Sequence, residues 1–357
     1  MRVKLEEVCK RIYAGGDVPK DRYSEVKTEE YSVPIYANAE KDDGLYGYTD
    51  KAREEELSLT IAARGTIGFT AIRREPFLPV VRLITVVPDT DKVSERYLYY
   101  VLCNCKTQSS GTSIPQLTVP DIKKNSLELH SIAEQEYIAD QLDKVNRIIE
   151  LRQKELDVLD NLIKARFVEM FGDPIKNPKG WDVVKLSECL ERIDNGKSFT
   201  CDSNAREGAF PAILKLSAAT YGDYRPYENK ALLDEKQFVK SVEVHRGELL
   251  FTRKNTPDLV GMAAYVFETP EKLMMPDLIF RLVTNERMTP IFLWQLINNR
   301  EFRPVIQGIS GGSAKSMSNI SKERLKNIEV ICPPISEQKK LEGVLEQVDK
   351  SKVMNVI

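Results

Sequence analysis

Apolar residues recur at an alternating spacing of four and three positions through the middle of the chain. These positions form an apolar seam of Ile138, Leu142, Val145, Ile149, Leu156, Leu159 and Ile163, with Arg152 as the one charged member. Such spacing places the side chains on one stripe of an α-helix, as in a coiled coil. Ser131 with Glu134 is typical of a helix start, and Gly172-Asp173-Pro174 of a helix end. The pattern predicts a helix over residues 131–171, roughly 58 Å long at 1.5 Å per residue.

A second long helix is expected at the end of the sequence. It begins at Pro334, and its seam contains Leu341, Leu345 and Val348. Two such helices, each following a globular segment, are expected to pack as an antiparallel pair that holds the two globular segments at opposite ends. The second helix is about 15 residues shorter than the first. This difference leaves two possibilities, an unpaired far end of the coiled coil or a shortened chain.

Shorter patterns in the rest of the chain indicate mixed strands and helices. Residues 58–72 have alternating apolar positions interrupted by a glycine-containing turn at 64–68, which predicts two strands joined by a tight turn. Residues 97–102 and 292–297 are expected to form short buried helices. A loop of small residues follows each of them, at 109–113 and 310–314.

The sequence contains an internal repeat. Residues 3–12 and 184–193 are identical at six of ten positions, and the apolar residues from Leu117 to Val145 recur 203 positions later, from Ile320 to Val348. The ends of each half repeat while the middle varies, so we expect two copies of one architecture. We predict a first domain at 1–130, a central helix at 131–172, a second domain at 173–333 and a C-terminal helix at 334–357.

Composition describes an ordinary globular protein. The formal net charge is −2, and the three segments 1–130, 131–171 and 172–357 carry net charges of −1, −3 and +2. Such a balance excludes a general polyanion-binding protein and favours selective contacts or a basic partner. No run approaches the roughly 18 apolar residues of a membrane helix, and the N-terminus does not resemble a signal peptide. Six cysteines without a CxxC pair indicate free thiols in the cytoplasm.

Catalytic motifs are not apparent. The two histidines, His130 and His245, are too few for a metal site or a catalytic triad. Gly196-Lys197-Ser198 ends like a phosphate-binding loop, but Glu191 stands where the loop needs its first glycine. The acidic-proline-proline-aromatic tetrapeptide of adenine methyltransferases is also missing. We therefore expect a protein without catalytic activity.

This organisation resembles the specificity subunits of type I restriction-modification systems. The resemblance covers essentially the whole chain and is carried by the helix starts at 131–135 and 334–338, the Met170–Pro174 helix end, and the Gly180-Trp181 segment with Lys185-Leu186. It implies an α+β, pseudo-twofold protein in which two α/β target-recognition domains, separated by antiparallel coiled-coil helices, each recognise half of a split target in double-stranded DNA. It also implies methyltransferase and restriction subunits as partners. S-adenosylmethionine, ATP and Mg would then belong to those partners, and this chain would hold no cofactor.

Loop residues with polar or aromatic side chains are the candidates for DNA contact, because such groups reach phosphates and base edges. In the first half they are Tyr36, Asn38, Tyr46, Tyr48, Arg64, Thr112, Ser113 and Gln116. In the second half they are Lys197, Ser198, Lys215, Arg253, Lys254, Asn255, Ser313 and Lys315. Two alternatives stay open: a coiled-coil scaffold that binds proteins with its globular ends, and an unrecognised nuclease or methyltransferase.

Overall fold

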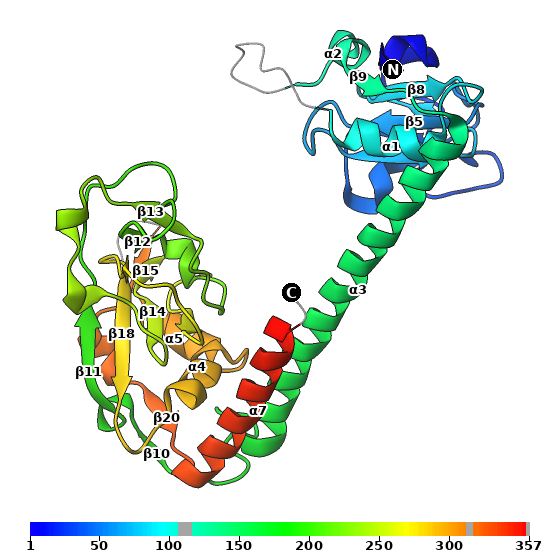
Figure 1. The fold of residues 1–357 in the computed structure, drawn as a ribbon. Coiled ribbons are helices and arrows are strands. Elements are labelled where there is room, and N and C mark those ends of the chain that lie inside the picture. Colours follow the sequence, from blue (N-terminus) through cyan, green and yellow to red (C-terminus); the bar gives the residue numbers. More distant parts are fainter. Residues whose placement is uncertain (106–115, 312–316, 355–357) are drawn as a thin grey trace. The chain divides into compact units, whose positions relative to one another are not determined.

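A computed structural model describes residues 1–105, 116–311 and 317–354. These residues belong to two units, Met1–Arg152 (unit 1) and Gln153–Ile357 (unit 2). The boundary between the units falls inside the long helix α3, Ile132–Phe171 (Figure 1). The predicted central helix is thus confirmed to within one residue at its start.

Unit 1 is built from three small sheets. Its strands are β1 Arg2–Lys4, β2 Cys9–Ala14, β3 Val33–Tyr36, β4 Leu45–Thr49, β5 Ser58–Ile61, β6 Thr70–Arg73, β7 Leu78–Pro79, β8 Ile84–Pro88 and β9 Ser126–Glu128. The largest sheet is antiparallel with the order β2-β8-β5-β6. The second has the order β4-β3-β7, with β3 and β7 parallel, and β1 pairs with β9. The strand–turn–strand predicted at 58–72 is confirmed as β5 and β6.

The core of unit 1 lies between the largest sheet and helix α1, Glu95–Cys103. Every residue of β5 and β8 is buried, and Leu59 of β5 shares one apolar cluster with Leu98 and Leu102 of α1. The helix predicted at 97–102 is therefore confirmed. Three shorter helices complete the unit, α2 Val119–Lys124 and the 3-10 helices η1 Leu5–Glu7 and η2 Lys41–Gly44.

Unit 2 repeats this arrangement. Its strands are β10 Val183–Lys185, β11 Leu190–Asn195, β12 Ala212–Leu214, β13 Asn229–Ala231, β14 Leu249–Thr252, β15 Lys254–Asn255, β16 Ala263–Tyr265, β17 Leu273–Met274, β18 Ile279–Thr284, β19 Ser318–Asn319 and β20 Glu329–Ile331. The sheet orders β11-β18-β14-β16 and β13-β12-β17, with β10 paired to β20, match those of unit 1 strand for strand. The predicted duplication is confirmed.

The helices of unit 2 include three that have no counterpart among the described residues of unit 1. Helix α4, Pro290–Asn298, corresponds to α1 and confirms the helix predicted at 292–297. The additional helices are α5, Arg303–Gly308, and the 3-10 helices η5 Glu235–Gln237 and η6 Lys240–Val242. The others are α6 Lys322–Lys326, α7 Ile335–Met354 and the 3-10 helices η3 Leu186–Glu188 and η4 Leu216–Ala218.

Helix α7 packs antiparallel to the C-terminal half of α3 (Figure 1). Ile163 and Phe167 of α3 are buried in the same apolar cluster as Leu341 and Leu345 of α7, and Leu159 packs against that cluster. Val348 also belongs to it. The expected α+β class, with two similar units and an antiparallel pair of long helices, is confirmed.

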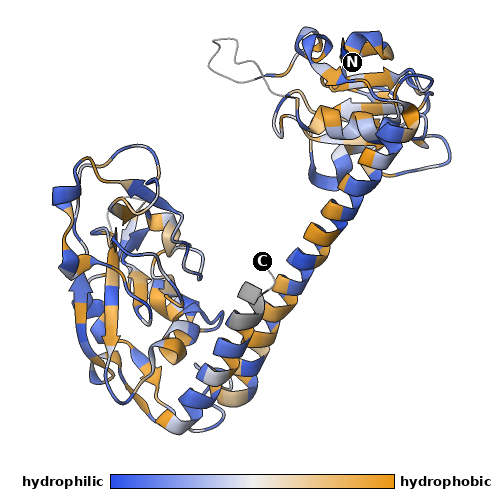
Figure 2. Cartoon of the chain, viewed as in Figure 1, coloured by the Kyte–Doolittle hydropathy of each residue, from blue (hydrophilic) through white to orange (hydrophobic). Residues whose placement is uncertain are grey.

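The apolar seam from Leu142 to Ile149 is exposed in the part of the chain that the structure describes. Leu142, Val145 and Ile149 are 38%, 51% and 60% exposed, and Leu156 is half-buried. Figure 2 shows apolar residues continuing along α3 beyond the end of α7. Ile138, by contrast, packs against the core of unit 1. The seam residues thus lie in three different environments along one helix.

Candidate nucleic-acid interface

Hydrogen bonds define which residues of the two units are equivalent after strands β5 and β14. In unit 1 the N–H of Leu117 donates to the carbonyl of Ala63 at 3.0 Å. In unit 2 the N–H of Ile320 donates to the carbonyl of Arg253 at 2.8 Å. Ala63 and Arg253 are therefore equivalent, so the basic residues that follow them, Arg64 and Lys254, occupy the same position of the repeat.

A basic side chain and an amide side chain meet at this position in unit 1. Arg64 is exposed, and its Nε and Nη2 donate to Gln116 Oε1 at 3.0 and 2.7 Å. The two residues were predicted separately, and the structure brings them together. A guanidinium held in this way still has free N–H donors for a phosphate or a guanine edge.

Unit 2 places similar groups at the equivalent position. Lys254 of β15 pairs with Asn319 of β19, and Asn319 lies 203 positions after Gln116. Arg253 Nε donates to Asn319 Oδ1 at 3.4 Å, and its guanidinium lies 5.2 Å from the centre of the Phe280 ring. Each unit thus has a basic side chain and an amide at one strand end. Sequence analysis did not identify Asn319, although its position follows from the 203-residue offset.

Two predicted residues of unit 1 are engaged within the protein. Asn38 Oδ1 accepts from the N–H of Ala63 at 2.7 Å, and Asn38 Nδ2 donates to the carbonyl of Val81 at 2.5 Å. Tyr36 is buried, its hydroxyl donates to Glu75 at 3.2 Å, and the guanidinium of Arg73 lies 3.6 Å from its ring centre. Asn38 therefore supports the backbone next to Arg64, Tyr36 packs against Arg73, and neither residue presents its polar groups to a ligand.

An exposed aromatic pair lies at β4. Tyr46 is 49% exposed, and its ring centre lies 5.7 Å from that of Tyr23. Gly47 allows this approach, because an added Cβ would lie 2.5 Å from the Tyr23 ring. Tyr48 is half-buried and pairs through its backbone with Ser24. Tyr23 was missed by sequence analysis because no motif marks it.

Among the predicted residues near the N-terminal side of unit 2, Lys197 and Ser198 are exposed. They follow Gly196, where an added Cβ would lie 2.0 Å from the carbonyl oxygen of Pro276. This glycine is therefore required by close packing of two backbones, which gives a structural reason for the Gly-Lys-Ser sequence. Lys215 Nζ lies 3.7 Å from Glu228 Oε2.

Asn255 is buried in unit 2. Its Nδ2 donates to Thr220 Oγ1 at 3.2 Å, and its Oδ1 accepts from the N–H of Thr256 at 2.8 Å. Its amide supports the strand end and is not presented at the surface. The remaining predictions, Thr112, Ser113, Ser313 and Lys315, lie outside the described residues.

A buried glutamine fixes the start of the long helix that ends each repeat, α3 after β9 and α7 after β20. In unit 1, Gln135 Oε1 accepts from the N–H of Ser94 at 2.9 Å, and its Nε2 donates to the carbonyls of Lys92 and His130 at 3.0 and 2.9 Å. In unit 2, Gln338 Oε1 accepts from the N–H of Thr289 at 2.9 Å. Its Nε2 donates to two carbonyls, at 3.0 and 2.7 Å. The repeated Glu-Gln pair in the sequence was the visible signal for this contact.

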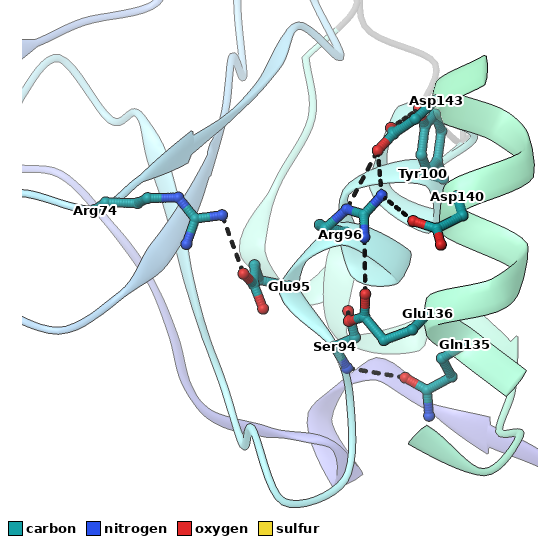
Figure 3. Close-up of polar contacts among 9 residues, drawn as sticks. All are labelled: Arg74, Ser94, Glu95, Arg96, Tyr100, Gln135, Glu136, Asp140 and Asp143. Carbon is teal, nitrogen blue, oxygen red and sulfur yellow. Dashed lines mark hydrogen bonds and ion pairs between the residues drawn. The ribbon is translucent and has the colours of Figure 1, made fainter. Parts of the chain in front are cut away.

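Unit 1 also anchors α1 on α3 by charge (Figure 3). Arg96 Nη1 lies 2.9 Å from Glu136 Oε2, and its Nη2 lies 2.6 Å from Asp140 Oδ1 and also contacts Asp143. Hydrogen bonds from Tyr100 and Arg96 lower the pKa of Asp143. These ion pairs hold α1 against α3, and the charged groups that form them remain partly exposed to solvent.

In unit 2 the corresponding contact, between α4 and α7, is apolar. Thr289 is equivalent to Ser94, so Ile291 is equivalent to Arg96, and Ile291 is fully buried in the cluster that contains Leu341. The two copies of the architecture therefore use different interactions at the same place. Sequence analysis did not predict this difference, because Arg96 lies in a segment without a motif.

Comparison with known proteins identifies the class to which this duplicated architecture belongs. The family model of the type I restriction modification DNA specificity domain matches residues 1–161 and again residues 178–355. The chain belongs to this family.

Relatives with known names agree with this assignment. A proposed type I specificity subunit of Mycoplasma pneumoniae is 34% identical over 171 residues, which are 45% of this chain and 50% of that protein. The specificity subunit of the type I restriction enzyme EcoEI from Escherichia coli is 29% identical over 176 residues, 48% of this chain and 30% of that protein. The matched part spans half or less of these two relatives.

A solved structure shows the same fold. It is the crystal structure of the S subunit of a type I restriction-modification system from M. genitalium. The TM-score is 0.57 at 14% identity, and the match covers 99% of this chain and 90% of that chain.

Proposed function

We propose that this chain is the DNA-recognition subunit of a type I restriction-modification enzyme and that each unit recognises one half of a bipartite target. The observation that carries the proposal is that the DNA specificity domain matches the chain twice, once in each structural copy. A protein with two recognition domains can bind two half-sites at a high effective concentration when their spacing matches. The chain itself has no catalytic role in this proposal.

The strand-end groups support a contact with DNA. Arg64 and Lys254 are the basic residues at the equivalent position: Arg64 bonds the Gln116 side chain, and Lys254 pairs through its backbone with Asn319. Basic groups neutralise phosphates and set register, while amide and guanidinium groups can discriminate base edges. The near-neutral net charge of −2 agrees with binding through a few selective contacts.

Partners complete the proposed enzyme. Methyltransferase subunits would bind the long helices, and restriction subunits would join the complex. S-adenosylmethionine, ATP and Mg would act on those subunits, and a cytoplasmic location follows from action on DNA. Within the described residues, no helix is long and apolar enough to cross a membrane.

A selection experiment tests the proposal. The chain, alone and with a candidate methyltransferase subunit, is mixed with duplexes of random sequence, and bound duplexes are sequenced over several rounds. We expect enrichment of two short sequences separated by a fixed gap. The Arg64→Ala and Lys254→Ala variants should each weaken binding, and Lys176→Ala, at an exposed lysine in the loop after α3, serves as the control. Binding without any enriched sequence, or no binding at all, would instead favour the protein scaffold.

A further inference from the structure

Two cysteine thiols face each other in unit 2, close to the start of α7. Cys189 Sγ lies 3.9 Å from Cys332 Sγ, although 143 positions separate the residues. Cys189 follows η3 and is fully buried, while Cys332 follows β20 and is partly exposed. The proposed role of the protein in DNA recognition does not use either residue.

The architecture does not require thiols at these positions. Leu129 occupies the position of Cys332 in unit 1. The N–H of Leu129 donates to the carbonyl of Met1 at 2.7 Å, and the N–H of Cys332 donates to the carbonyl of the equivalent Asp182, also at 2.7 Å. Val8 occupies the position of Cys189, 181 residues earlier. An apolar pair in one copy is thus replaced by two thiols in the other.

The surroundings of Cys332 make its sulfur the more reactive one. A cavity of about 340 Å³ beside it is lined by Trp181, Arg287 and Pro334, among others. The hydrogen bond from the Cys189 thiol, with the charge of Arg287, lowers the pKa of Cys332 to about 7. The same hydrogen bond and burial raise the pKa of Cys189. A thiolate at Cys332 therefore has an open approach, and a protonated thiol lies behind it.

We propose that Cys332 and Cys189 form a reactive pair, a nucleophilic and a resolving thiol, that is oxidised by low-molecular-weight disulfides such as oxidised glutathione. The Cys332 thiolate attacks one sulfur of glutathione disulfide, the S–S bond breaks, and one glutathione leaves as its thiolate. Cys189 then attacks Cys332 Sγ, and its proton passes to the second departing glutathione. Two protein thiols are oxidised and one glutathione disulfide is reduced to two thiols.

The geometry requires only a local movement. A disulfide has an S–S length of about 2.0 Å, so the two sulfurs must approach by about 1.9 Å. The new bond would join the beginning and the end of the sheet region of unit 2, because Cys189 precedes β11 and Cys332 follows β20. Closing so long a loop restricts the unfolded chain, and we expect the oxidised protein to unfold at a higher temperature.

Mass spectrometry of the full chain tests the reaction. The protein is incubated with oxidised glutathione, quenched at intervals, and digested without reduction. We expect a cross-linked peptide pair containing Cys189 and Cys332, with little glutathione retained. At pH 7 a thiol of pKa 7 should react about sixfold faster than one of pKa 9, after allowance for its lower nucleophilicity. Burial raises the pKa of Cys103 above the ordinary value for a thiol, so reaction at Cys332 should precede reaction at Cys103, and the rate at Cys332 should rise with pH through a midpoint near pH 7.

Two variants copy the apolar pair of unit 1 and are expected to fold. Cys189→Val should trap glutathione on Cys332, because no thiol is left to displace it, but more slowly than the native protein reacts, because the hydrogen bond that lowers the pKa of Cys332 is lost. Cys332→Leu should leave Cys189 unmodified, because that thiol is buried. Absence of the cross-link in the native protein, failure of Cys189→Val to accumulate the mixed disulfide, or faster reaction at Cys103 would each overturn the proposal. None of these outcomes depends on DNA binding, so the function proposed above is tested separately.

Discussion

The buried glutamine of unit 2 gives the sharpest stability prediction. Replacing Gln338 by leucine keeps a similar volume but removes the partner of the Thr289 N–H and of two carbonyl oxygens. A buried polar group without a partner costs about 1–3 kcal/mol, so the buried Thr289 N–H and Pro333 carbonyl together predict a loss of about 2 kcal/mol even at the lower end of that range. Gln338→Glu keeps the acceptor for Thr289 but sets a carboxylate against both carbonyls, and it should be no less damaging.

Tryptophan fluorescence makes the assay specific to one unit. The only tryptophans of the chain are Trp181 and Trp294, and both lie in unit 2. Denaturant titration followed by tryptophan emission should show the loss for Gln338→Leu. The equivalent variant Gln135→Leu should shift the circular dichroism transition and leave the tryptophan midpoint unchanged.

A matched control distinguishes the loss of the Gln338 hydrogen bonds from a general effect of replacing glutamine by leucine. Gln153 is exposed on α3, and its Nε2 donates to Asp157 Oδ1 at 3.1 Å, so Gln153→Leu should change stability by less than about 0.5 kcal/mol. A loss below about 1 kcal/mol for Gln338→Leu would refute the reasoning, since the two buried groups could not then depend on this amide. A shift of the unfolding midpoint measured by tryptophan emission in Gln135→Leu would also refute the reasoning.

Three further predictions follow from other contacts. Arg96→Ala should destabilise unit 1 by about 1 kcal/mol at low salt and by less at high salt, since its ion pairs are partly exposed. Gly196→Ala should cost about 1–3 kcal/mol in unit 2 because its Cβ would collide with backbone, whereas Gly308→Ala, with open space around it, should be neutral. Arg64→Ala and Lys254→Ala should each lower the slope of log affinity against log salt by about 1 if each contacts a phosphate.

The controls for these predictions are direct. Salt-independent destabilisation by Arg96→Ala would show that its contribution is packing. Equal stability of Gly196→Ala and Gly308→Ala would contradict the close backbone approach. An unchanged slope of log affinity against log salt for both basic variants would show that neither Arg64 nor Lys254 contacts a DNA phosphate.

The repeated frame of the molecule could be predicted from sequence because it depends on local and periodic signals. The seam spacing and the Gly172 stop placed α3, and the offsets of 181 and 203 placed the strands and helices that begin and end each unit. The 22-residue difference between the two offsets could not be located. The structure distributes it over several connections, including the one that contains α5.

The site could be predicted only in part, because residue type does not decide whether a loop side chain faces solvent or protein. Arg64 and Gln116 lie together at the surface, but Asn38 and Asn255 use the same amide chemistry to hold backbone inside the protein. The equivalence of Arg64 with Lys254 depended on long-range hydrogen bonds that no sequence spacing reveals.

The central claim is that the two units recognise the two halves of one target. The most direct measurement is to co-express the chain with a methyltransferase partner in cells free of other adenine methylation and to map methylated adenines by sequencing the genomic DNA. The account predicts marks at a single bipartite motif with a fixed gap, and Arg64→Ala and Lys254→Ala should relax opposite halves of it. Marks at one continuous motif, or loss of both halves with either variant, would contradict independent recognition by the two units.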